Sequence, residues 1–374
     1  EPGSTFKVVS TVSAISDGTI NLEDEFNCED GSFEYYTKKI TDHESFSMLT
    51  LPQIMHHSSN IGIVKMMEEV GQKRLFTVGR DFGFGSKTGI SLNGEVTGKL
   101  NHYNDWSAVS LGMIAMGHEV GVTAMQLASA YCVIANGGYL LKPRIIRQIM
   151  DQNENIIYSE EPIVIRKIAD SATMKSVREM LRGVVTKGTG KNANIAGWKV
   201  AGKTGTAQKW KSGKYSNEEF ISNFIGFFPY DNPQLLALIM LDEPSKPFHW
   251  GNEGAAVAFK RVIKRIINMD DDILPPTQKK IEEVFDPMNV IVNVNEEDFE
   301  SARELSQIQL ATFANNSNKV LVPEVRGLSM RKTMATLYKR GLKYKINGSG
   351  KVFWQYPKPG EAVSKGTVCE VGLK

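Results

Sequence analysis

The sequence predicts an α+β protein, with helices packed on an antiparallel sheet and a small module after them. Segments with helical spacing of apolar residues occupy most of the chain before residue 197, and short apolar runs bounded by turn residues follow. Helices that precede an antiparallel sheet are typical of a layered α+β domain. A change to polar, acidic composition at about residue 276 then indicates where the first domain ends.

The predicted helices have clear boundary signals. Pro2 and Gly3 precede Ser4, which places Ser4 at the N-terminus of the first helix. The run Asn136-Gly137-Gly138 stops the third helix. Apolar spacing predicts helices at residues 6–15, 51–67, 124–135 and 172–185, and a later one at 255–267.

Three short strands are predicted between the last two helices. Residues 197–202 alternate in polarity and are bounded by glycine. Residues 224–228 and 235–241 are apolar runs separated by a Pro/Asp/Asn turn, which is typical of a hairpin. We assign these elements to a first domain, residues 1–275.

A linker and a compact module complete the chain. Residues 276–318 are polar and acidic, as in a linker. Residues 319–374 predict a βαβββ module: a strand at 320–322, a helix from Ser329 to Arg340, and three short strands.

Composition excludes several classes of function. Lys and Arg number 44 against 42 Asp and Glu, which argues against a nucleic-acid partner. The three cysteines and six histidines lack ligand spacing, so we expect no metal and no cofactor. No apolar run is long enough for a membrane span, and Glu1 directly precedes the first predicted motif. Because this first residue is not Met, we expect the chain to be truncated, so that any anchor upstream of Glu1 would be missing.

The motif Ser4-Thr5-Phe6-Lys7 places a hydroxyl and an amine on one face of a helix. A serine hydroxyl needs an adjacent base to become a nucleophile. A lysine serves as that base when burial or a neighbouring cation lowers its pKa. Ser4 is therefore the candidate nucleophile and Lys7 the candidate base.

Two later motifs supply partners for this pair. Ser58 can relay a proton between Lys7 and a leaving amine, and Asn60 can hold a substrate amide. The motif Lys203-Thr204-Gly205-Thr206 continues a strand along which an extended substrate can lie. Within it, Lys203 offers a cation near Lys7, Gly205 permits close approach, and Thr206 offers a hydroxyl to a carboxylate. The N–H groups of Ser4 and Thr206 form the expected oxyanion pair.

Each motif also occurs elsewhere by chance. Ser329-Met330-Arg331-Lys332 repeats the first motif, but its serine begins a helix of the small module and is interpreted as an N-cap. Lys87-Thr88-Gly89 and Ser91-Leu92-Asn93 lie in glycine-rich turns. Only the first set stands in the order that is the signature of penicillin-binding proteins and class A β-lactamases.

At these residues the chain resembles the class B, monofunctional penicillin-binding proteins, most closely the division-type transpeptidases. The similarity runs from Glu1 to about Ile267. The module at residues 319–374 resembles a PASTA domain, which implies binding of peptidoglycan or a structural role. Two departures stand out: the strands that precede the nucleophile helix in the family are missing, and Gly117-His118-Glu119 replaces a Gly-Tyr-Gly type of loop.

The resemblance implies a D,D-transpeptidase of the penicillin-binding protein and serine β-lactamase fold. Its substrates would be stem peptides ending in D-Ala-D-Ala, and β-lactam antibiotics would acylate Ser4. It also implies other cell-wall synthesis or divisome proteins as partners, and a place on the extracytoplasmic face of the bacterial cytoplasmic membrane. A serine β-lactamase, a D,D-carboxypeptidase and an inert β-lactam- or peptidoglycan-binding protein remain alternatives. Division is the favoured process, before spore cortex synthesis and elongation.

Overall fold

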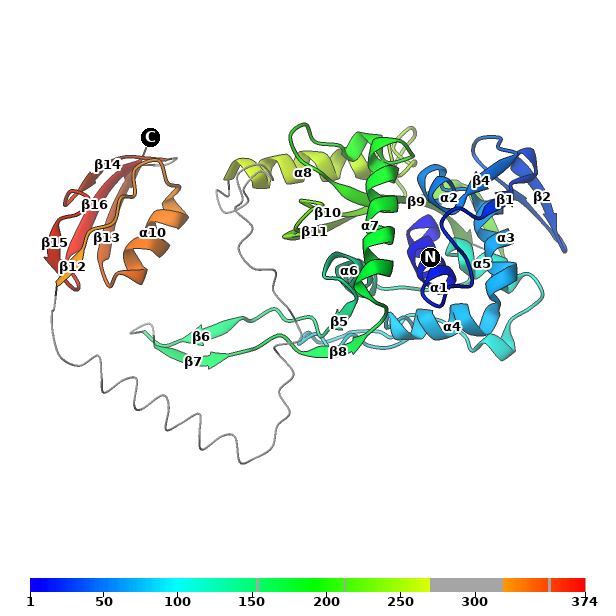
Figure 1. Ribbon diagram of the computed structural model, residues 1–374, viewed down its shortest axis with the longest axis horizontal. Helices are drawn as coiled ribbons and strands as arrows, with labels where there is room; N and C mark the ends of the chain where they lie inside the picture. Colours follow the sequence, from blue (N-terminus) through cyan, green and yellow to red (C-terminus); the bar gives the residue numbers. More distant parts are fainter. Residues whose placement is uncertain (153–154, 212, 270–318, 349–350, 374) are drawn as a thin grey trace, which may run out of the picture. The chain divides into compact units, whose positions relative to one another are not determined.

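The computed structural model describes residues 1–152, 155–211, 213–269, 319–348 and 351–373. The chain divides into two compact units, residues 1–264 and 265–374 (Figure 1). The linker predicted at residues 276–318 lies outside the described residues.

A buried helix stands at the centre of the first unit. The 3₁₀ turn η1 (Gly3–Phe6) continues directly into α1 (Lys7–Ile15), as predicted, and α1 is buried on all sides except at its last residue. The buried hydroxyls of Ser10, Thr11 and Ser13 each donate a hydrogen bond to a backbone carbonyl. Because buried hydroxyls without partners destabilise a fold, these bonds allow a polar helix to lie in the core.

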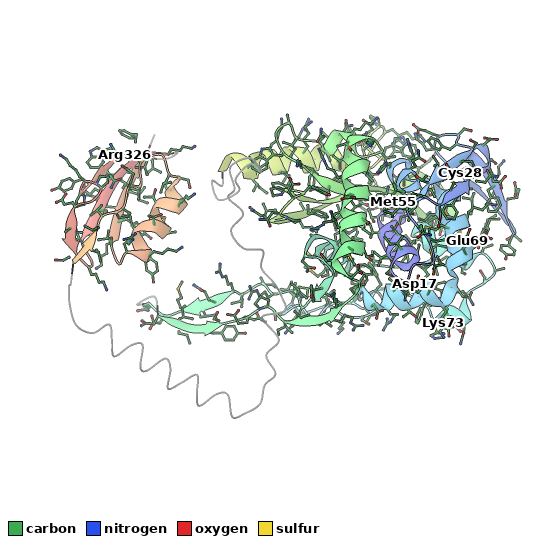
Figure 2. The ribbon with its side chains drawn as sticks, viewed as in Figure 1. Asp17, Cys28, Met55, Glu69, Lys73 and Arg326 are labelled. Carbon is green, nitrogen blue, oxygen red and sulfur yellow. The ribbon has the colours of Figure 1, made fainter. Side chains whose placement is uncertain are left out.

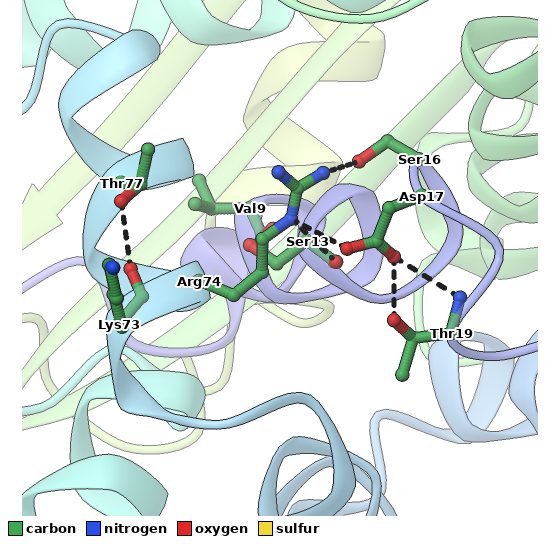
Figure 3. Close-up of polar contacts among 8 residues, drawn as sticks. All are labelled: Val9, Ser13, Ser16, Asp17, Thr19, Lys73, Arg74 and Thr77. Carbon is green, nitrogen blue, oxygen red and sulfur yellow. Dashed lines mark hydrogen bonds and ion pairs between the residues drawn. The ribbon is translucent and has the colours of Figure 1, made fainter.

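A single arginine holds the C-terminal end of α1 (Figure 3). Arg74, on α4 (Gln72–Asp81), donates to Ser16 Oγ at 2.6 Å and to the carbonyl of Ser13 at 3.4 Å. Its Nε also lies 3.2 Å from Asp17 Oδ2. A cation at this end satisfies carbonyls that have no partner within the helix.

The segment at residues 51–67 forms two helices, where the sequence predicted one. Helix α2 (Leu51–His57) ends at Ser58, which has a left-handed backbone with φ of 60°. Helix α3 (Asn60–Val70) then begins with Ser59 as its N-cap. A left-handed residue cannot continue a right-handed helix, so Ser58 is placed at a sharp break.

The other predicted helices lie close to their expected bounds. Thr123 and Gln126 form a capping box at the start of the third predicted helix. Among the described residues, no helix is both long and apolar enough to cross a membrane. The remaining helices before residue 270 are α5 (Ser110–Met116), α6 (Ala124–Ala135), α7 (Ser171–Thr186) and α8 (Ala255–Met269), with short turns η2 (Glu29–Gly31), η3 (Tyr103–Asp105) and η4 (Lys191–Ala193).

The main sheet has the antiparallel strand order β11-β10-β9. Its strands are β9 (Ala201–Lys211), β10 (Lys214–Phe228) and β11 (Leu235–Asp242). The strand predicted at residues 197–202 begins only at Ala201, so the motif from Lys203 to Thr206 lies inside β9. Within the described part of the chain, β9 is an edge strand that pairs on one side only.

Besides the main sheet, the described part of the first unit has four two-stranded antiparallel ribbons. They pair β1 (Glu25–Asn27) with β4 (Met48–Thr50), β2 (Ser32–Tyr35) with β3 (Lys38–Thr41), β5 (Tyr139–Leu141) with β8 (Val164–Lys167), and β6 (Gln148–Met150) with β7 (Ile156–Ser159). The ribbon of β6 and β7 projects away from the helices (Figure 1).

Side-chain packing joins α1 to the elements that carry the later motifs. Met55, which is labelled in Figure 2, lies on α2 and is fully buried. Its Sδ lies 3.1 Å from Thr11 Oγ1 of α1. Phe6 packs on Phe84 with a ring separation of 5.2 Å. Both η1 and α1 are therefore set in a close-packed core, where small displacements are costly.

The second unit has the predicted order, with one further short strand. It consists of β12 (Lys319–Leu321), α10 (Met330–Lys339), β13 (Lys343–Gly348), β14 (Val352–Tyr356), β15 (Ala362–Ser364) and β16 (Val368–Leu373). Strand β16 pairs with β13 in parallel and with β14 antiparallel, and β12 pairs with β15. Val325, Leu337 and Val371 lie in its apolar core.

Candidate active site

The turn that carries Ser4 is held tightly from two sides. The N–H of Gly3 donates to the carbonyl of Gly117 at 3.1 Å, and Asn223 Nδ2 donates to the carbonyl of Pro2 at 3.3 Å. A Cβ on Gly117 would lie 2.0 Å from the oxygen of Gly3, and φ of Gly117 is 91°. Only glycine both fits in this space and adopts this backbone angle freely. The contact between Gly117 and Gly3 therefore fixes the position of the turn that carries Ser4.

Lys7 is buried, and oxygen atoms of residues 58–60, the Ser-Ser-Asn segment, surround its amine. Its Nζ donates to the carbonyl of Ser58 at 2.6 Å, to Asn60 Oδ1 at 2.8 Å and to the carbonyl of Ser59 at 3.2 Å. Burial lowers the pKa of Lys7 to about 7, against the opposing effect of the Asp42 carboxylate. At neutral pH a lysine with this pKa is uncharged in about half of the molecules, and its uncharged amine can accept a proton.

Lys203 reaches the same segment from β9. It is fully buried, and its Nζ lies 2.8 Å from Ser58 Oγ, which is itself 3.3 Å from Nζ of Lys7. Burial, together with the charge of Lys7, lowers the pKa of Lys203 well below that of a free lysine. The structure thus brings Lys7, Ser58 and Lys203 together, as the sequence predicted for these three motifs.

The expected contact between Lys7 and Ser4 is absent from the described hydrogen bonds. Lys7 Nζ donates to the oxygens of the Ser-Ser-Asn segment, and Ser4 Oγ has no partner among the described residues. Ser4 is partly exposed. As the second residue of a helical turn, its N–H has no acceptor within the helix. Catalytic hydrogen bonds are often long in a free enzyme and tighten when substrate binds.

Thr206 lies beside the Ser4 turn. A Cβ on Gly3 would be 3.2 Å from the carbonyl oxygen of Thr206. The hydroxyl of Thr206 accepts a hydrogen bond from the N–H of Gly251 at 3.0 Å, and it keeps its own proton to donate. Gly205 permits a close approach of β9 to the neighbouring strand β10. A Cβ on Gly205 would lie 2.3 Å from Asn223 Oδ1.

Sequence reasoning missed Asp42, which orders the Ser-Ser-Asn segment. Its carboxylate accepts hydrogen bonds from Ser59 Oγ and from the N–H groups of Asn60 and Ile61. The carbonyl of Thr41 accepts from Asn60 Nδ2 at 2.9 Å. An acidic side chain at a helix N-terminus is favourable, and this one also orients Asn60. Asp42 follows β3, far from the motif in sequence, and nothing near it signals the contact.

Thr189 is a second residue that the motifs did not reveal. Its Oγ1 lies 2.9 Å from Oγ1 of Thr204, and its N–H donates to the carbonyl of His56 at 3.0 Å. A Cβ on Gly188 would be 1.9 Å from the same carbonyl oxygen. The Gly188-Thr189-Gly190 run in the sequence is the signal that could have found it.

Glu1 links the Ser4 turn to two other segments. Its carboxylate lies 3.1 Å from His118 Nδ1 and accepts from the N–H of Glu119 and from Tyr215 Oη, each at 3.1 Å. Although burial opposes it, the hydrogen bond with His118 lowers the pKa of the Glu1 carboxyl. The histidine that departs from the family loop therefore contacts Glu1, two residues before the turn that carries Ser4.

The repeated motifs lie in other surroundings. Ser329 caps α10 through the N–H of Lys332 and belongs to the second unit. Thr88 bonds to Glu95 Oε1 within a loop. Within the described residues, no group of three or more His, Cys, Asp or Glu side chains is arranged to hold a metal ion.

Two family models match the chain. The penicillin-binding protein transpeptidase domain matches residues 1–267, and the PASTA domain matches residues 320–371.

Curated relatives extend the similarity. The chain is 31% identical to stage V sporulation protein D of Bacillus subtilis over 376 residues, which cover 100% of this chain and 54% of that protein. It is 32% identical to penicillin-binding protein PbpB of Mycolicibacterium smegmatis, over 69% of this chain and 41% of that protein. The chain therefore spans about half the length of these relatives.

Solved structures share the fold. The ampicillin complex of penicillin-binding protein 3 from Mycobacterium tuberculosis matches with a TM-score of 0.67 and 28% identity, covering 76% of this chain and 65% of that one. The transpeptidase domain of penicillin-binding protein 3 from Burkholderia pseudomallei matches with a TM-score of 0.66 and 26% identity, covering 74% and 81%.

Proposed function

Because this chain belongs to the penicillin-binding protein transpeptidase family, we propose that it cross-links peptidoglycan stem peptides through an acyl-enzyme on Ser4. The observation that carries this proposal is the pair of buried amines of Lys7 and Lys203 on the hydroxyl of Ser58. An inert binding protein would have no use for two lysines whose burial disfavours their charge.

Acylation begins with proton transfer from Ser4 Oγ to the neutral amine of Lys7. The serine oxygen attacks the penultimate carbonyl of a D-Ala-D-Ala donor that lies along the free edge of β9. The N–H groups of Ser4 and Thr206 stabilise the oxyanion, because preorganised donors are most effective where negative charge develops. Asn60 holds a donor amide, and the Thr206 hydroxyl binds the terminal carboxylate.

The tetrahedral intermediate collapses when the bond to the terminal D-Ala breaks. The departing amine takes a proton from Ser58, which regains one from Lys7. The amine of a second stem peptide then attacks the ester carbonyl, loses its proton through the same route and releases Ser4. Lys203 supports this relay by holding Ser58 Oγ at 2.8 Å.

β-Lactams enter the same path because they present a strained amide next to a carboxylate. When the ring opens, the departing nitrogen stays attached to the acyl group on Ser4. It therefore remains in the site and blocks the entry of an acceptor amine. The enzyme acts on the extracytoplasmic face of the cytoplasmic membrane, where peptidoglycan lies. Its partners are other cell-wall synthesis or division proteins, and the PASTA unit contacts peptidoglycan.

A labelled penicillin tests the proposal in the intact protein. We expect one stoichiometric adduct, which peptide mass spectrometry places on Ser4 and which Ser4→Ala removes. Ser329→Ala changes the same motif in the second unit and serves as the matched control, with full labelling expected. Labelling that persists in Ser4→Ala, or rapid turnover of nitrocefin, would contradict a slow acyl-enzyme on Ser4.

A further inference from the structure

Two exposed rings meet between segments that are far apart in the sequence. The rings of His43 and Trp250 have centroids 5.1 Å apart and planes inclined by 46°. His43 follows β3, whereas Trp250 lies between β11 and α8. Trp250 keeps 42% of its surface exposed, so this contact lies at the surface and not in the core.

The residues before His43 are bound to the Ser-Ser-Asn segment. Asp42 accepts hydrogen bonds from Ser59 and Asn60, and the carbonyl of Thr41 accepts from Asn60 Nδ2. These bonds fix the backbone on which His43 stands. The position of the His43 ring is therefore set from the side that carries Asn60.

The residue after Trp250 is bound to β9. The N–H of Gly251 donates to Thr206 Oγ1 at 3.0 Å. A Cβ on Gly251 would lie 2.7 Å from the carbonyl oxygen of Gly205, so the chain passes close to the strand. The position of the Trp250 ring is therefore set from the side that carries Thr206.

Ring contacts hold the side chain of Trp250, whereas hydrogen bonds hold its backbone, from its N–H to the carbonyl of Pro247 and from the N–H groups of Glu253 and Gly254 to its carbonyl. The ring of His249 lies 5.0 Å from Trp250 and 5.1 Å from Phe220. His249 Nδ1 is buried, and within the described part of the chain it has no hydrogen-bond partner. Contacts between rings are individually weak. The Trp250 ring can therefore turn away from His43 by losing ring contacts alone, while the backbone hydrogen bonds stay in place.

We propose that His43 and Trp250 form an aromatic gate that limits the size of the donor group beyond the amide held by Asn60. The proposal rests on the function proposed above, because it assumes a donor between Asn60 and β9. The two rings join the segments that hold these groups. A donor with a narrow group enters with the gate closed, whereas a wide group must separate the rings.

Two penicillins that differ only in the size of the acyl group on the 6-amino nitrogen test the gate. The readout is the ratio of their second-order rate constants for acylation of the intact protein. We expect His43→Ala and Trp250→Ala to raise the ratio of bulky to compact reagent about two- to tenfold, as expected from the loss of one aromatic contact. Trp250→Phe keeps a ring and should remain near wild type.

Trp210→Ala is the matched control. Trp210 is an exposed tryptophan on β9 that packs on Tyr215 and not on His43, so its loss should leave the ratio unchanged. Thermal unfolding of each variant shows whether it is folded. An unchanged ratio in folded His43→Ala and Trp250→Ala proteins would overturn the gate, even if Ser4 is acylated normally. Failure of wild-type acylation would instead reject the proposed function.

Discussion

Lys7 and Lys203 are two fully buried lysines whose amines contact the same side-chain oxygen, at 3.3 and 2.8 Å. That oxygen belongs to Ser58, at the break between α2 and α3. Two ammonium groups this close repel each other with little solvent to screen them. The arrangement therefore favours the loss of a proton at neutral pH and brings one residue of each of the three motifs into contact, as the proposed proton relay requires.

We expect acylation by penicillin to increase with pH through a limb centred near pH 7. Burial lowers the pKa of Lys7 to about 7, and only its neutral amine can accept the Ser4 proton. Below the limb the rate should fall about tenfold per pH unit. Rate constants measured between pH 5 and 9 test this. Lys7→Arg keeps the positive charge but cannot accept a proton. If the pH profile of that variant showed the same limb, Lys7 would not be the group that causes it.

Replacing Asp42 should move this limb to lower pH. The carboxylate of Asp42 raises the pKa of Lys7, so Asp42→Asn removes a charge that favours the ammonium form. Glu44→Gln is the control, because Glu44 is a nearby exposed carboxylate that contacts His57. The pH profile of each variant is the measurement, and a shift to higher pH in Asp42→Asn would contradict the assignment.

Two substitutions of Ser58 should distinguish the effect of its hydroxyl on activity from the effect of its backbone conformation on stability. Ser58→Ala and Ser58→Gly both remove the relay hydroxyl, and each should slow acylation by about 10²- to 10⁴-fold. Ser58 has φ of 60°, which glycine adopts freely. The glycine variant should therefore unfold with a free energy about 1 kcal/mol higher than the alanine variant. Denaturant titrations compare them, and equal stabilities would show that no strain resides at this position.

Gly117→Ala should displace the Ser4 turn. The added Cβ would lie 2.0 Å from the oxygen of Gly3, and we expect a loss of about 1–3 kcal/mol in unfolding free energy with slower acylation. Gly18→Ala is the matched control, since Gly18 has φ of 78° but no atom within 4 Å of a Cβ. It should lose only about 1 kcal/mol and acylate normally. Equal effects of the two changes on acylation would argue against the Gly3–Gly117 contact.

Local patterns predicted most of the helices because their signals lie within the helices themselves. Residues 124–135 were predicted with the bounds that α6 has, since the apolar spacing lies within the helix and glycines end it. The break at Ser58 was not predicted. A serine in the left-handed region has no distinctive sequence, and tertiary contacts of Ser59 and Asn60 with Asp42 hold the chain there.

By itself, the sequence determined the fold class, the family resemblance and the residues of the three motifs, because these depend on residue type, order and spacing. Only the tertiary structure decided that Lys7 points at the Ser-Ser-Asn segment and that Asp42 and Thr189 adjoin the motifs. It alone placed His43 against Trp250. Contacts of this kind join segments that are distant in the chain, and they form only when packing of the core brings those segments together.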